Sequence, residues 1–108
     1  MYQLRDGDET ILPEFLAKER KDFSLELRRI LNRLRLVPLA ERVVIVVVEP
    51  NKKWRLAKLG ASRGAPVSYL DERIFASHKL AEWEALKMRW RQITGSDYPV
   101  ALDPTSQN

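Results

Sequence analysis

The chain has 108 residues, of which 44% are hydrophobic and 31% are charged, and its formal net charge at pH 7 is +4. This length allows one folded domain, residues 1–108, and the composition excludes a disordered chain. Cysteine is absent, which excludes disulfide bonds and thiolate metal sites. The positive excess is mild, so it permits a nucleic-acid partner and equally an acidic protein partner.

The first residues, MYQLRDGDET, are polar and acidic, unlike the basic and apolar start of a signal peptide. The longest apolar run, Val43 to Val48, has six residues, whereas a membrane-spanning helix needs about 20. We therefore expect a cytoplasmic protein without a membrane segment. We expect residues 1–8 to be flexible or docked on a partner.

Two helices are predicted before the first strand. Thr10 is a candidate N-cap for the first, with Pro13 in its first turn. Ser24 is a candidate N-cap for the second, SLELRRILNRLR, which Pro38 cannot continue. The second helix has an apolar stripe at helical spacing: Leu27, Ile30, Leu31 and Leu34. Its arginines lie mostly around the opposite side: Arg28, Arg29, Arg33 and Arg35.

The strongest strand signal runs from Arg42 to Val48, because β-branched side chains suit a pleated surface. The run does not alternate with polar residues, so we expect both faces of this strand to be covered. Residues 49–52, EPNK, have turn chemistry, and Trp54 to Leu59 is predicted to return as an antiparallel strand. After a loop from Gly60 to Pro66, Val67 to Leu70 is predicted to form a short third strand.

The last helix is predicted to begin after the N-cap Ser77 and to end near Thr94, where Gly95 stops it. The tail, residues 96–108, is expected to be flexible or docked on a partner, with its last six residues disordered. The fold class that follows is α+β: N-terminal helices, a small antiparallel sheet of two to three strands, and a C-terminal amphipathic helix.

The last helix has two apolar stripes. At about 100° per residue, one stripe gathers Trp83, Leu86, Trp90 and Ile93. The other, roughly 150° away, gathers Ala81, Ala85 and Met88. A small sheet covers only one stripe, so the other must meet either the N-terminal helices or a different chain. Cover by the second predicted helix and contact with a different chain are both open, and the second is consistent with the enrichment of tryptophan, methionine and arginine at the centres of protein interfaces.

No set of residues in the sequence indicates catalysis. His78 is the only histidine and falls in the first turn of the last helix, where an exposed structural role is the simpler interpretation. Asp71 and Glu72 are neighbours in a turn, and Glu82 and Glu84 point to different sides of a helix, so neither pair directs two carboxylates at one atom. The loop Gly60–Gly64 lacks the pattern of a phosphate loop.

The order of features resembles the small subunit of bacterial N,N-dimethylformamidase and related two-subunit amidohydrolases. The resemblance spans roughly residues 25–93 and rests on order and spacing: a helix ending in LVP, a β-run, a charged turn before a tryptophan, a second strand, the turn DER and a capped helix. It implies a non-catalytic chain that packs on a large catalytic subunit. In that family the large subunit binds one iron through tyrosine and glutamate side chains and hydrolyses a small N-substituted formamide to amine and formate.

We therefore expect no catalytic residue and no cofactor in this chain, with iron in the large partner subunit of a hetero-oligomer. The partner contacts that we predict are Trp83, Trp90, Met88, Arg89, Trp54 and Arg29. The alternative function is a small basic nucleic-acid-binding module that uses the arginines of the second helix. An independent enzyme is the weakest alternative, because the acid–base candidates are scattered.

Overall fold

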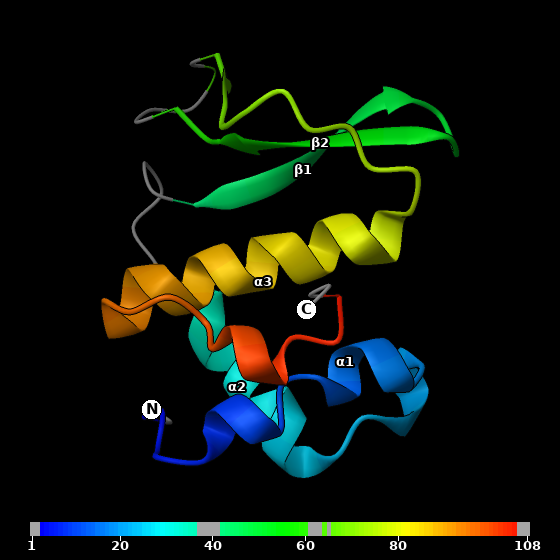
Figure 1. The fold of residues 1–108 in the computed structure, drawn as a ribbon. Helices are drawn as coiled ribbons and strands as arrows, with labels where there is room; N and C mark the ends of the chain where they lie inside the picture. Colours follow the sequence, from blue (N-terminus) through cyan, green and yellow to red (C-terminus); the bar gives the residue numbers. More distant parts are fainter. Residues whose placement is uncertain (1–2, 37–41, 61–63, 65, 106–108) are drawn as a thin grey trace.

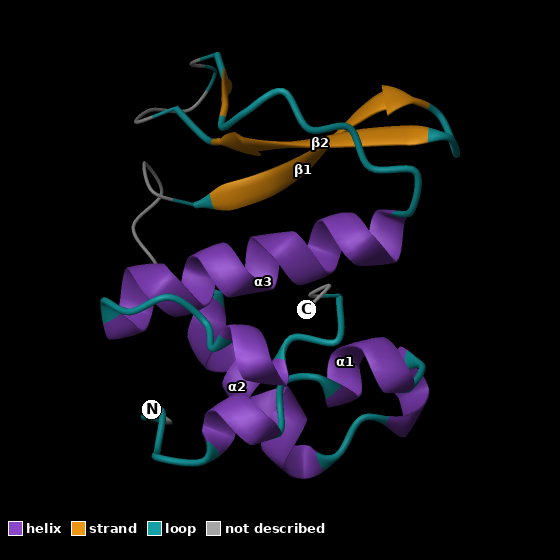
Figure 2. Cartoon of the chain, viewed as in Figure 1, coloured by secondary structure: helices purple, strands orange, loops and turns teal. Residues whose placement is uncertain are grey.

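The computed structural model describes residues 3–36, 42–60, 64 and 66–105. Three layers are stacked: a small sheet, one long helix and a group of short helices (Figure 1). Figure 2 shows the same layers by secondary structure. In chain order the elements are η1 (Asp8–Thr10), α1 (Glu14–Ala17), η2 (Arg20–Asp22), α2 (Leu25–Leu34), β1 (Val43–Glu49), β2 (Lys53–Lys58), β3 (Ser68–Tyr69), α3 (His78–Thr94) and η4 (Val100–Leu102).

The predicted α+β class is confirmed, with N-terminal helices, a three-stranded antiparallel sheet and a C-terminal helix. The predicted helix break at Val37 and Pro38, and residues 61–63 and 65 of the predicted loop, lie outside the described residues. Among the described helices, none combines the length and the apolar character needed to cross a membrane.

The N-terminal layer is built on α2. Ser24 caps it as predicted, because its Oγ accepts a hydrogen bond of 3.1 Å from the backbone N–H of Leu27. The prediction for Thr10 is wrong: Thr10 lies inside η1, and its hydroxyl donates to the carbonyl of Gly7 at 2.6 Å. The first α-helix therefore begins later, directly after Pro13, whose fixed φ suits the start of a helix.

The sheet has the order β1-β2-β3, and each neighbouring pair is antiparallel. In the β1–β2 register, Ile45 lies opposite Leu56 and Val47 lies opposite Trp54. The connection is tight because Asn51 adopts a positive φ of 62°, which asparagine tolerates better than most residues. All three strands were therefore placed correctly by their β-branched and apolar runs.

Helix α3 is the middle layer, and the rest of the chain covers both of its stripes. Ala81 and Ala85 pack with Val43 and Leu56 in a core between α3 and the sheet. On the other side, Trp83 packs in a second core with side chains of the N-terminal helices: Leu12, Phe15, Phe23, Leu27, Ile30, Leu31 and Leu34. The two-stripe prediction is confirmed, and of its two alternatives the intramolecular cover is the correct one.

The expectation that both faces of β1 are covered is wrong. Helix α3 lies on one face of the sheet, and Figure 1 shows no helix on the other. Val44 and Val46 point to this second face and stay only half-buried, because no second layer follows. A continuous apolar run predicts a strand but does not by itself guarantee cover on both faces within one chain.

Residues 96–105 of the tail pack onto α3, and the expectation that residues 96–108 are flexible or docked on a partner stays a prediction. Tyr98 is buried, its ring meets those of Trp83 and Trp90 edge-on, and its hydroxyl donates to the carbonyl of Glu9. Burial raises the pKa of the Tyr98 hydroxyl. The lead is also tied down, since Leu4 packs against the same core.

Asp103 fixes the end of the tail. Its Oδ1 accepts a hydrogen bond of 2.9 Å from the indole N–H of Trp83, and its Oδ2 lies 2.6 Å from the ammonium of Lys87. Although burial opposes ionisation, the hydrogen bonds from Lys87, Thr105 and Trp83 lower the pKa of the Asp103 carboxyl to about 2.

Replacing Asp103 with asparagine should lower the free energy of unfolding by about 1–2 kcal/mol near neutral pH, since charged hydrogen bonds are lost. A carboxyl with a depressed folded-state pKa stabilises the fold above its unfolded value of 3.8 and loses that effect as pH falls toward about 2. The difference between wild type and Asp103→Asn, measured by urea unfolding, should therefore shrink from pH 6 to pH 2. A difference that is independent of pH would contradict this.

Trp83 should be the most costly single truncation in α3. It is 0% exposed, and replacing a buried tryptophan with alanine typically costs about 3–5 kcal/mol. Leu80→Ala, on the same helix but 42% exposed, is the matched control and should cost less than about 1 kcal/mol. Equal losses in thermal unfolding would show that the Trp83 side of α3 is not a core.

Candidate partner interface

The face of the sheet that α3 leaves open is the first candidate surface. We call it the outer sheet face and define it by the register as Val44, Val46, Arg55, Ala57 and Tyr69. The guanidinium of Arg55 stacks 3.9 Å above the ring of Tyr69, and together they enclose the small side chain of Ala57. Tyr69 remains 49% exposed. This face therefore offers aliphatic surface beside an aromatic ring, the composition of an interface core.

The second candidate surface is the outer edge of β1, which pairs with β2 alone in the described sheet. The backbone N–H of Leu59 donates to the carbonyl of Arg42. From this bond onward, the residues of β1 alternate between those whose backbone groups point toward β2 and those whose backbone groups point away from it. The N–H and C=O groups of Ile45 and Val47 therefore point away from β2. An apolar strand with unpaired backbone groups is a template for strand addition.

The end of β1 makes this edge more apolar. Val47 and Val48 are 55% and 46% exposed, and a register shift between Val47 and Glu49 leaves Val48 without a paired residue on β2, whereas Val47 still lies opposite Trp54. The carbonyl of Val43, at the other end of the same edge, is already used, because Arg89 Nη2 donates to it at 2.7 Å. The unpaired part of the edge is thus centred on Ile45 and Val47.

Two of the six predicted partner contacts lie inside the chain. Trp83 is 0% exposed and Trp90 is 6% exposed, and both pack in the core between α3 and the N-terminal helices. They offer a partner almost no surface in this fold. Their contact with a partner stays a prediction. In the structure they pack α3 against the layer of N-terminal helices.

The other four predicted contacts lie nearer the surface but are not gathered into one patch. Met88 and Trp54 are half-buried against the core between α3 and the sheet, and the Trp54 ring lies 5.8 Å from that of His78. Arg89 is half-buried beside β1, whereas Arg29 is exposed on α2. As contacts with a partner, these four also remain predictions.

Four of the candidate acid–base residues have close charged or hydrogen-bonding partners: His78, Asp71, Glu82 and Glu84. His78 Nδ1 lies 2.9 Å from Glu82, whose other oxygen binds Arg20 at 3.0 Å. Glu84 binds Arg73 at 2.7 Å and Lys87 at 2.5 Å. No three His, Asp or Glu side chains of the described residues are grouped so that they could hold a metal ion. The resemblance places iron in the large partner subunit, and that stays a prediction.

Sequence reasoning missed a cluster of arginines beside the edge of β1. Arg35 follows the last turn of α2, Arg42 precedes β1, and Arg89 rises from α3. They line an open groove of about 570 Å³, together with Leu36, Ile45, His78 and Glu82. We call this the arginine groove. No periodicity in the sequence could have found it, because its members come from three elements that meet only in the folded chain.

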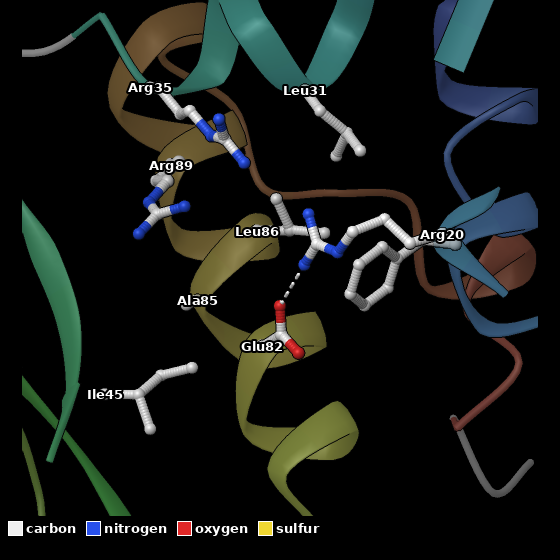
Figure 3. A pocket seen from close by; sticks show the side chains of 9 residues that line it. Arg20, Leu31, Arg35, Ile45, Glu82, Ala85, Leu86 and Arg89 are labelled. Atoms are coloured by element: carbon white, nitrogen blue, oxygen red, sulfur yellow. Dashed lines mark hydrogen bonds and ion pairs between the residues drawn. The ribbon is translucent and has the colours of Figure 1, made fainter. Parts of the chain in front are cut away.

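A smaller pocket adjoins the arginine groove. It has a volume of about 80 Å³ and shares Arg35, Ile45, Glu82 and Arg89 with the groove. Figure 3 shows the guanidinium groups of Arg35 and Arg89 side by side at this pocket, with Arg20 reaching Glu82 from the other side. Burial lowers the pKa of Arg89, and the charges of Arg35 and Arg42 lower it further. The charge of Glu82 acts in the opposite direction.

The arginines around α2 are partly gathered. Arg28 and Arg35 line one open pocket together with Arg20, whereas Arg29 is exposed on α2. The nucleic-acid alternative stays a prediction.

The fold and these surfaces define a small α+β chain that exposes apolar side chains on its sheet, at Val47, Val48 and Tyr69, and also on its helices, as at Leu80 of α3. Comparison with known families finds a match to the N,N-dimethylformamidase alpha subunit over residues 5–98. The chain belongs to this family. The match extends beyond the range of the sequence resemblance at both ends and includes Tyr98. Comparison with curated proteins and with solved structures finds no match.

Proposed function

We propose that this chain is the non-catalytic subunit of an iron-dependent, N,N-dimethylformamidase-like amidohydrolase. It stabilises a larger catalytic subunit in a cytoplasmic hetero-oligomer. That larger subunit carries the iron and hydrolyses a small N-substituted formamide to amine and formate. The observation that carries this proposal is the family match over residues 5–98, because an alpha subunit implies a partner subunit.

The open side of the sheet supports the proposal. A three-stranded sheet with one uncovered, largely apolar face and one unpaired edge has surface that a partner would remove from water. Val44, Val46 and Tyr69 would lie at the centre of such a contact, and Arg55 would be held in place by its stacking on Tyr69. This surface replaces the stripes of α3 as the docking site, because the chain itself already covers those stripes.

Docking on the outer sheet face would also protect the chain. An unpaired apolar strand edge invites irregular pairing between copies, and natural proteins cover or charge such edges. A larger subunit that sits on this side would cover both the face and the edge. Stabilisation is then mutual, since a partner that binds only the folded chain shifts its unfolding equilibrium by mass action.

The proposal is tested by co-expressing the tagged chain with an N,N-dimethylformamidase large subunit and measuring the affinity of the purified complex. Val46→Lys places a charge at the centre of the outer sheet face and should weaken the complex at least tenfold. The chain itself should stay folded, because Val46 is only half-buried. Leu25→Lys is the matched control, since Leu25 is 58% exposed on α2, in the opposite layer.

The control should leave the affinity within about twofold of wild type. Failure to recover any complex with the large subunit would overturn the proposed function. An unchanged affinity for Val46→Lys, or an equal loss for Leu25→Lys, would place the contact elsewhere on the chain.

A further inference from the structure

The arginine groove carries positive charge that the described residues do not neutralise. Three guanidinium groups line it, and Glu82 is the one carboxylate among the lining residues that the structure describes. Glu82 is already bound by Arg20 at 3.0 Å and by His78 at 2.9 Å. No ion pair of Arg35, Arg42 or Arg89 occurs among the residues that the structure describes.

Arg89 is the arginine of the groove whose surroundings least favour its positive charge. Its guanidinium donates one hydrogen bond, to the carbonyl of Val43, while its Nε is buried without a partner. Burial and the nearby charges of Arg35 and Arg42 all disfavour its cationic form. A bound carboxylate would reverse these effects, because it accepts hydrogen bonds and cancels charge at the same time.

The unpaired edge of β1 forms one wall of the same groove. Ile45 lines it, and the backbone N–H and C=O of Ile45 and Val47 point outward from this edge. A strand added here would lie about 4.8 Å from β1. Every second side chain of such a strand would point to the side of the sheet where α3 carries Arg89.

We propose that the arginine groove receives an extended acidic segment of the large subunit. The segment pairs with the outer edge of β1 and places an aspartate or glutamate carboxylate among Arg35, Arg42 and Arg89. The arginine groove, about 570 Å³ in volume and lined by all three arginines, has room for such a group, since a water molecule occupies about 30 Å³ in the liquid. This inference rests on the proposed function, because it assigns the segment to the partner subunit.

A second copy of this chain is a poorer occupant than an acidic segment. Each copy carries a net charge of +4, so two copies repel. Strand β1 has a single carboxylate, Glu49, which already pairs with Lys52 at 3.6 Å and Lys53 at 3.7 Å. Charge complementarity therefore favours a different, acidic chain.

The first test uses the purified complex with the large subunit. Arg35→Gln combined with Arg42→Gln should weaken the complex at least tenfold and reduce the dependence of its affinity on salt concentration. The matched control is Lys21→Gln combined with Arg91→Gln, which removes the same charge from side chains that are 76% and 70% exposed. The control should change the affinity by less than about twofold.

The second test is amide hydrogen exchange of the wild-type complex at single-residue resolution. The amides of Val44 and Val46 point toward β2 and should be protected whether or not a strand is added. The amides of Ile45 and Val47 should be equally protected only if a strand of the partner pairs with them. The exchange rates of Ile45 and Val47 are thus compared with those of Val44 and Val46 in the same complex.

Fast exchange of Ile45 and Val47 in an intact complex would overturn this inference and leave the proposed function standing. An equal loss of affinity in the control variant and in the Arg35 and Arg42 variant would also overturn this inference. The net charge of the chain, and not the position of the two arginines, would then explain the loss. Protection that arises from two copies of this chain, seen as a dimer by mass in the absence of the large subunit, would also overturn it. If no complex forms, both the inference and the proposed function fail.

Discussion

The fold depends on the burial of α3 from two sides. Ala85 and Trp83, two positions apart, face different cores: the alanine packs with Leu56 of the sheet, and the tryptophan packs with the helices of the N-terminal layer. The small alanines allow the sheet to approach closely, while the tryptophan fills a thicker space on the other side. A chain of this length could not bury both sides of a helix against one layer. The three-layer arrangement therefore follows from the two stripes.

This constraint explains where the exposed apolar surface is left. With α3 in the middle, the sheet can be covered on one face only, and the outer sheet face has no further element to meet it. The C-terminal tail packs on α3 and not on the sheet. There the ring of Tyr98 contacts Trp83, and the carboxylate of Asp103 accepts a hydrogen bond from the indole of Trp83. The outer sheet face is thus left open by the described chain, and membership in the N,N-dimethylformamidase alpha subunit family implies a partner subunit.

Local signals in the sequence predicted most of the elements. The caps Ser24 and Ser77, the stop at Gly95 and the valine run of β1 each depend on neighbouring residues alone, and the structure confirms them. The family was also recognisable from the order of these elements. The N-terminal turn around Thr10 was misjudged because two short-range alternatives compete there, a 3-10 turn and an α-helix.

The candidate surfaces were harder to predict, for a physical reason. Tryptophans are common both in cores and at interfaces, so Trp83 and Trp90 satisfied both interpretations until the position of α2 was known. Arg35, Arg42 and Arg89 are unremarkable in sequence, and only the crossing of α2, β1 and α3 brings them together. Local pattern fixes elements, whereas sites made by three elements depend on tertiary packing.

The most direct measurement of the central claim is site-specific photo-crosslinking in the complex with the large subunit. A photoreactive phenylalanine derivative would replace Val46 on the outer sheet face or Leu25 on α2, one position at a time. The account predicts a crosslink to the large subunit from position 46 and none from position 25. A crosslink from position 25 alone would contradict it, because the partner would then sit on the helical layer and not on the sheet.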